Sequence, residues 1–91
     1  MKITIKYLTL FRKITGKSRE EFVLKEECTL QEFIINHICA KYENINEYIM
    51  DNNKISKRAT FFVDNDQVDM DKPLQLKDNT IISVVTQIQG G

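Results

Sequence analysis

The sequence predicts an α+β fold in which one mixed sheet packs against one main helix. Segments with the two-residue alternation of strands stand near both ends of the chain, and the clearest helix signal lies between them. No regular strand–helix alternation runs along the chain, which argues against a parallel α/β sheet. The 91 residues are enough for one modest core and too few for two. We therefore expect a single domain over residues 1–86, followed by a flexible tail over residues 87–91.

The N-terminal part is predicted to form two paired strands joined by a short helix. Residues 2–8 alternate as a strand, and the positions expected to face the core are Ile3, Ile5 and Tyr7. Residues 10–15 fit one or two helical turns, which Gly16 would end. Alternation over residues 20–25 predicts a second strand that pairs with the first.

The main helix is predicted to begin at a capping box, Thr29-Leu30-Gln31-Glu32. Thr29 can cap the first exposed amides, and Glu32 can accept from the backbone of Thr29. Apolar residues then recur every three or four positions, at Leu30, Phe33, Ile34, Ile38 and Tyr42. We expect Ile35 and Cys39 to widen this stripe, so that the helix lies deep in the concave face of the sheet.

The second half is predicted to complete the sheet. Residues 43–58 are polar and rich in asparagine, which indicates a short helical turn followed by a surface loop. The expected elements after it are a strand at 59–63, a turn at 64–66, a short strand at 67–69, a turn at 78–79 and a final strand at 80–86. Leu74 and Leu76 are expected to point inward from the irregular piece that begins at Pro73.

This order of elements predicts the ubiquitin-like β-grasp arrangement. The chain crosses over through the main helix between the first and the last strand, so these two strands are expected to lie side by side and parallel. The result is a mixed sheet of four to five strands packed on one main helix.

Composition gives no support to several classes of function. Lysine plus arginine equals aspartate plus glutamate at 13 each, so nothing in the net charge favours nucleic acid or a membrane surface. No apolar run approaches the roughly 20 residues of a membrane span. Cys28 and Cys39 form no Cys-x-x-Cys pair, and with no secretion signal we expect a cytoplasmic protein in which both are small hydrophobic residues.

No metal site is expected. The only histidine, His37, has no cysteine or carboxylate at ligand spacing, which favours a surface or boundary position. The aspartates at positions 64, 66, 69 and 71 resemble a calcium loop but lack its glycine and terminal glutamate, which favours a solvated turn.

The sequence ends in Gly90-Gly91, two of its three glycines. Glycine averages about 7% of residues, so a chance pair at this place is rare. Without Cβ atoms, such a tail can thread a narrow channel, where its carboxylate becomes the reacting group. The alternative is a frayed end without a role.

Several stretches resemble the MoaD/ThiS family of ubiquitin-like sulfur-carrier proteins, and most of all its MoaD branch, the small subunits of molybdopterin synthase. The segments that carry the resemblance are Phe11 to Gly16, Thr29-Leu30, Phe62-Val63-Asp64, Lys72-Pro73-Leu74, Lys77-Asp78-Asn79 and Gly90-Gly91. The thiamine-pathway branch usually lacks the first of them.

The resemblance implies a carrier that is not an enzyme by itself and holds no cofactor permanently. A ubiquitin-activating-type adenylyltransferase (MoeB-like) would use ATP to adenylate the carboxylate of Gly91. A sulfur donor enzyme would then displace AMP and leave a thiocarboxylate. Gly90 would keep the tail slim as it enters the large subunit of molybdopterin synthase (MoaE-like), which uses the sulfur for molybdenum cofactor biosynthesis.

Docking to such partners calls for an exposed apolar patch. By alternation, Leu8, Ile81 and Val85 should lie together on the outer face of the two central strands. Ile88 is a further candidate, since an isoleucine in the tail has little core to join, and Arg12 is a candidate at the rim. The alternative is that these are ordinary scattered surface residues.

Other functions remain open. The chain can be a sulfur carrier for thiamine synthesis or transfer RNA thiolation, a ubiquitin-like protein modifier, or a β-grasp interaction module with a silent tail. No nucleophile with a base, pair of carboxylates or phosphate loop argues for an enzyme acting alone.

Overall fold

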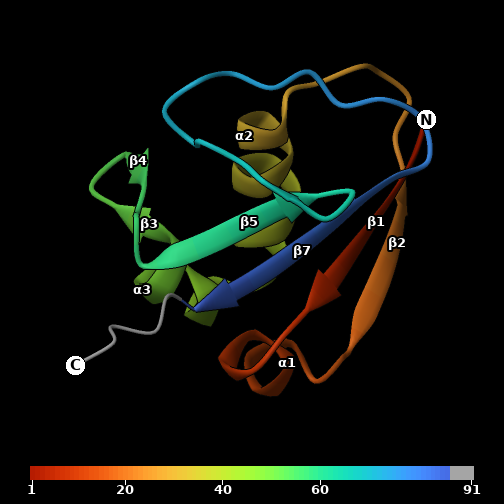
Figure 1. Ribbon diagram of the computed structural model, residues 1–91. Helices are drawn as coiled ribbons and strands as arrows, with labels where there is room; N and C mark the ends of the chain where they lie inside the picture. The colour runs from red at the N-terminus through yellow and green to blue at the C-terminus, as the bar shows by residue number, and fades with distance from the viewer. Residues whose placement is uncertain (87–91) are drawn as a thin grey trace.

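The first and last strands lie side by side at the centre of a five-stranded sheet in the computed structural model, which describes residues 1–86 (Figure 1). The strand order is β2-β1-β7-β5-β6. Strands β1 and β7 are parallel, and the other neighbours are antiparallel. The strands are β1 (Lys2–Tyr7), β2 (Arg19–Val23), β5 (Ala59–Val63), β6 (Asp66–Gln67) and β7 (Thr80–Thr86). The predicted β-grasp fold and its parallel central pair are confirmed.

The core lies between this sheet and the main helix. Ile3, Ile5 and Tyr7 are fully buried, as predicted from their alternation. The register places Ile5 opposite Ile82 and Tyr7 opposite Val84, so the inner faces of the two central strands form one apolar surface. The fully buried Phe61 of β5 and Phe11 of the short helix α1 (Leu10–Thr15) extend it.

The main helix begins at the predicted capping box. The amide of Glu32 donates to Thr29 Oγ1 at 3.1 Å, and the amide of Thr29 donates to Glu32 Oε1 at 2.9 Å. From this cap the helix runs as α2 (Leu30–Phe33) and continues as η1 (Ile34–Cys39) across the concave face of the sheet (Figure 1).

The segment η1 is a π-helix, and it corrects one part of the predicted stripe. Cys39 is buried as expected, but Ile35 is 40% exposed. Hydrogen bonds from residue i to i+5 give a wider turn than those of an α-helix, so the side chains rotate out of the regular spacing. Ile34, Ile38 and Cys39 therefore face the sheet, and Ile35 faces away from it.

Substituting Thr29 by alanine tests the cap. Thr29→Ala removes the acceptor for the Glu32 amide, and we expect a loss of about 1 kcal/mol in the free energy of unfolding. Urea denaturation measures this loss. Ser18→Ala is the matched control, because within residues 1–86 the Ser18 side chain makes no hydrogen bond, and it should cost less than about 0.5 kcal/mol. Equal effects of the two substitutions would contradict the role of the cap.

The N-terminal elements differ from expectation only at their ends. The helix α1 ends at Gly16, which has a φ of 74°, as predicted for a left-handed cap. Strand β2 spans Arg19–Val23 instead of residues 20–25, because β1 begins at Lys2 and offers no further strand partner beyond Val23. Leu24 is nevertheless buried, and its amide donates to the carbonyl of Met1 at 2.7 Å.

The region from 43 to 58 is more ordered than predicted. A helical turn is present as η2 (Glu43–Ile45) and α3 (Asn46–Ile49), in agreement with the sequence. The expected surface loop instead contains a hairpin of β3 (Met50–Asp51) and β4 (Lys54–Ile55), whose turn includes Asn52 with a φ of 59°. Strands of two residues are too short for alternation to reveal.

The segment after β5 turns where the sequence predicted. Asp64 and Asn65 have φ values of 49° and 77°, a conformation that aspartate and asparagine tolerate better than most residues. Strand β6 is Asp66–Gln67 instead of residues 67–69, because this tight turn ends one residue early. Further along, Leu76 is buried and Leu74 is half-buried, as expected. No helix among the described residues is long and apolar enough to cross a membrane.

Candidate functional site

The outer face of the sheet, on the side away from the main helix, carries three of the predicted docking residues. Ile81 of β7 pairs with Thr4 of β1, opposite in direction to the buried Ile82, and is 38% exposed. Val85 also points outward and is half-buried. Leu8 follows β1, donates its amide to Val84 O at 3.1 Å and is half-buried. The structure thus brings Leu8, Ile81 and Val85 onto one surface.

Phe62 lies on the same face and was missed by the sequence analysis. It pairs with Ser83 of β7, and it alternates with the fully buried Phe61. Phe62 is half-buried, so part of its ring is available at the surface. The alternation of residues 59–63 carried the signal, because an inward Phe61 requires an outward Phe62. We define the outer patch as Leu8, Phe62, Ile81 and Val85.

Charged residues border this patch on the side of β1 and β2. Lys2 forms an ion pair of 2.7 Å with Glu21, and Lys6 lies opposite Arg19. Val23, the most exposed large apolar residue of the described chain at 83%, lies opposite Lys2 at this edge. The outer face therefore carries its apolar side chains over β7 and β5 and its charged side chains over β1 and β2.

The end of β7 is the other part of the candidate site. Thr86 pairs with Ala59, and the helix α1 packs beside this end of the sheet (Figure 1). Arg12, the predicted rim residue, is exposed on α1. The predicted site residues Ile88, Gly90 and Gly91 lie outside the described residues.

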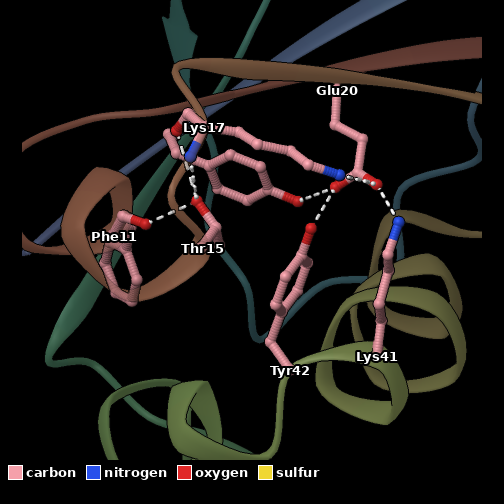
Figure 2. Close-up of polar contacts among 7 residues, drawn as sticks. Phe11, Thr15, Lys17, Glu20, Lys41 and Tyr42 are labelled. Carbon is pink, nitrogen blue, oxygen red and sulfur yellow. Dashed lines mark hydrogen bonds and ion pairs between the residues drawn. The ribbon is translucent and has the colours of Figure 1, made fainter.

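A polar cluster around Glu20 joins the sheet to the main helix (Figure 2). The hydroxyls of Tyr7 and Tyr42 donate to Glu20 Oε1 at 2.9 and 2.8 Å. Lys17 lies 3.3 Å from Oε2, and Lys41 also pairs with that oxygen. Only 9% of the Glu20 side chain is exposed. Strands β1 and β2 and the end of the helix thus meet at one carboxylate.

The surroundings of Glu20 keep it ionised. Desolvation opposes the charged form, but the hydrogen bonds from Lys41, Tyr42, Tyr7 and Lys17 outweigh it and lower the pKa of Glu20 to about 2. Burial, and then the hydrogen bond to Glu20, raise the pKa of Tyr7 above its usual range. The cluster therefore consists of a fixed anion held by neutral and cationic donors, and it links the edge strand β2 to β1 and to the end of the main helix.

Cys39 is buried in the core, and Cys28 is half-buried at its edge. Burial raises the pKa of Cys39 to about 11, and burial followed by the charge of Glu32 raises the pKa of Cys28. A thiol with a raised pKa is a poor nucleophile, because the thiolate is the reactive form. The raised pKa values therefore disfavour the thiolate form of both cysteines.

His37 occupies a boundary position, as predicted. Its ring stacks on Phe33 at 5.6 Å between centroids and meets the edge of Phe22 at 6.1 Å. Within residues 1–86, no group of three or more histidine, cysteine or acidic side chains is placed to hold a metal ion.

Comparisons with known proteins find solved structures of similar fold but no similar sequence. By sequence, no family model matches the chain, and no curated protein is significantly similar to it. By structure, the chain is similar to the small archaeal modifier protein SAMP1 from Haloferax volcanii, with a TM-score of 0.80, 6% identity and coverage of 100% of both chains.

Two further solved structures carry names related to molybdopterin. A putative molybdopterin converting factor, subunit 1, from Pyrococcus furiosus has a TM-score of 0.75 and 24% identity, over 97% of this chain and 99% of that one. A chain in the complex of subunits 1 and 2 of molybdopterin-converting factor from Helicobacter pylori has a TM-score of 0.61 and 17% identity, over 100% of both. At these identities the likeness establishes the shared β-grasp fold.

Proposed function

We propose that the chain is a ubiquitin-like sulfur carrier of the MoaD/ThiS kind, whose reacting group is the carboxylate of Gly91. The observation that carries the proposal is that the diglycine ends the sequence shortly after the strand that bears the outer patch. Residues 87–91 follow directly on β7, the strand that bears Ile81 and Val85. Five extended residues reach at most about 18 Å, enough to enter a partner's active site while the outer patch is docked beside it.

In this chemistry the role of residues 1–86 is to be recognised by the partner enzymes. A carboxylate is a poor electrophile, so an activating enzyme joins it to AMP from ATP and releases pyrophosphate. The outer sulfur of a persulfide then attacks the carbonyl and AMP leaves. Reduction of the remaining S–S bond by a second thiol leaves a thiocarboxylate on Gly91 and a disulfide on the donor. Gly90 contributes by offering no side chain to the channel.

The specific role that we propose is that of small subunit of molybdopterin synthase. The similar folds of the Pyrococcus and Helicobacter proteins support it, and the second of these is a complex of two subunits. The partners are then a MoeB-like adenylyltransferase, a sulfur donor enzyme and a MoaE-like large subunit, all in the cytoplasm. The chain contributes no active site of its own, and ATP binds to the activating enzyme.

A protein modifier is the second candidate, because the chain shares its fold with a protein named as a modifier. Both functions begin with the adenylate. They diverge at the acceptor, which is sulfur for a carrier and a lysine amine of another protein for a modifier. Isopeptide-linked conjugates in cell extract would favour the modifier.

The shared first step tests the proposal. The purified chain is incubated with a ubiquitin-activating-type adenylyltransferase from the same genome, ATP and labelled pyrophosphate. We expect exchange of label into ATP that depends on the chain and disappears when Gly90 and Gly91 are removed. Exchange that is absent, or unaffected by this truncation, would contradict the proposal.

The outer patch is tested by placing a charge in its centre. Ile81→Asp buries a carboxylate in the docked interface, and we expect the dissociation constant for the activating enzyme to rise at least tenfold, which is about 1.4 kcal/mol. Val23→Asp is the matched control, since Val23 is more exposed and lies at the far edge of the same face. Isothermal titration measures both. Equal affinities for the two variants would exclude the patch as the docking surface.

A further inference from the structure

Thr9 has an unusual backbone conformation between β1 and α1. Its φ is 49° and its ψ is −119°. The amide of Phe11 donates to the carbonyl of Leu8 at 3.0 Å, so Thr9 is the second residue of a tight turn. These angles are those of the first central residue of a type II′ turn, a position dominated by glycine. For a β-branched residue, a positive φ is a true outlier.

The neighbouring contacts explain the turn. The amide of Leu8 donates to Val84 O at 3.1 Å, which ties the chain to β7 just before the turn. Phe11 is fully buried and meets the edge of Tyr48 at 6.4 Å between centroids. The backbone must pass from the sheet surface to the core between these two residues. The chain makes this passage with a positive φ at Thr9, which glycine would adopt without strain.

The side chain of Thr9 makes the contact that glycine could not make. Its Oγ1 lies 3.4 Å from Oγ1 of Thr86, a contact longer than the usual O–H···O hydrogen bond of about 2.5–3.0 Å. Thr86 is the last residue of β7 and directly precedes residues 87–91. A strained residue whose side chain contacts the end of β7 motivates a functional hypothesis for that contact.

We propose that Thr9 is a positioning residue that holds Thr86, the last residue of β7, after which the chain continues toward Gly91. The inference rests on the proposed function, because it assigns Thr9 to the presentation of Gly91. A threonine side chain has few χ1 rotamers, so its hydroxyl points in a defined direction. Each hydroxyl can donate or accept, so either threonine can be the donor in this contact.

The expected consequence is kinetic. Residues of the outer patch set how tightly the carrier binds, and the Thr9–Thr86 contact sets how often a bound carrier presents its carboxylate in line with ATP. Loss of the contact should therefore lower kcat for adenylation and leave KM for the carrier unchanged.

Three substitutions of Thr9 separate the effect of its hydroxyl group from the effect of its backbone strain. Thr9→Val keeps the β-branched shape and loses the hydroxyl, so kcat should fall roughly fivefold. Thr9→Ser keeps the hydroxyl and should stay near the native kcat. Thr9→Gly relieves the strain, and we expect a higher unfolding temperature, by roughly 4–8 °C, together with the low kcat of Thr9→Val.

Thr86 provides the reciprocal test. Thr86→Val should lower kcat to the same extent as Thr9→Val, and the double variant should be no slower than either one. A native kcat in Thr9→Val, or additive losses in the double variant, would overturn the inference.

A measurement on the free protein separates this inference from the proposed function. The NMR order parameter of the Thr86 amide should be lower in Thr9→Val than in Thr9→Ser. If the native chain is never adenylated, the proposed function fails, and the order parameters still decide whether the two hydroxyls hold the end of β7. Equal order parameters in the two variants would show that they do not.

Discussion

One alanine appended after Gly91 is expected to abolish adenylation and sulfur transfer. The added residue moves the carboxylate by about 3.5 Å and gives it a neighbouring Cβ, whereas misplacement by 1 Å can already cost about a hundredfold in rate. We expect at least this loss in pyrophosphate exchange and in delivery of sulfur to the acceptor. Gly91→Ala should fold normally and be a poor carrier for the same reason.

The matched control for this prediction is the affinity of the extended chain for the activating enzyme. The appended residue leaves the outer patch untouched, so the extended chain should bind the activating enzyme with close to native affinity and compete with the native chain. Its unfolding temperature should also be native, because the core lies within residues 1–86. Full sulfur delivery by the extended chain would show that the reacting group lies elsewhere.

Glu20→Gln is expected to be the most destabilising polar substitution that we consider. The amide oxygen of glutamine can still accept from Tyr7 and Tyr42, but its amide nitrogen would face Lys17 and Lys41 in place of a carboxylate oxygen. Side chains hydrogen-bonded to a charge each contribute about 1.5–3 kcal/mol. We expect a loss of about 3 kcal/mol, which is a fall of more than about 10 °C in the unfolding temperature.

The neighbouring residue supplies a matched control. Glu21 is on the same strand and also has a lysine partner, Lys2, but 50% of its side chain is exposed. Exposed ion pairs contribute little, so Glu21→Gln should change the free energy of unfolding by less than about 1 kcal/mol. Comparable losses in the two variants would contradict the role assigned to the Glu20 cluster.

The same cluster predicts a dependence of stability on pH. The pKa of Glu20 is lowered in the folded chain from its ordinary 4.5 to about 2. A carboxylate with a lowered pKa stabilises the fold above its unfolded pKa, and this contribution, about 3 kcal/mol, is lost as the pH falls from about 5 to about 2. Urea titrations across this range should show the difference between the native chain and Glu20→Gln shrinking with acid. A constant difference would contradict the lowered pKa.

The parts of the fold that depend on local pattern could be predicted from the sequence. Ile3, Ile5 and Tyr7 alternate, Thr29 and Glu32 stand at capping-box spacing, and Gly16 marks the end of α1; each of these signals lies within a few residues. The parallel pairing of β1 with β7 followed from the order of elements and the helical crossover.

Features that depend on distant contacts could not be predicted. The Glu20 cluster combines residues from β1, β2 and the end of the main helix, and no spacing in the sequence predicts it. The π-helical segment rotates Ile35 outward, against the regular apolar spacing that had placed it in the core. The hairpin of β3 and β4 is too short for alternation.

Part of the candidate site could be predicted from the sequence. Leu8, Ile81 and Val85 were placed together by alternation, and their positions on the outer face agree with that expectation, while their role in docking stays a prediction. Phe62 could have been added by the same reasoning. The conformation of Thr9 carries no signal in the sequence, because the residue type does not report a positive φ.

The state of the terminal carboxylate tests the account most directly. The chain is purified from cells that also express its candidate activating enzyme and sulfur donor, and its intact mass is measured, followed by fragmentation of the C-terminal peptide. We predict a species in which one oxygen is replaced by sulfur, with the change located at Gly91. A chain that keeps two oxygens at Gly91 in the presence of both enzymes and ATP, or a mature protein that continues past Gly91 without being trimmed, would contradict it.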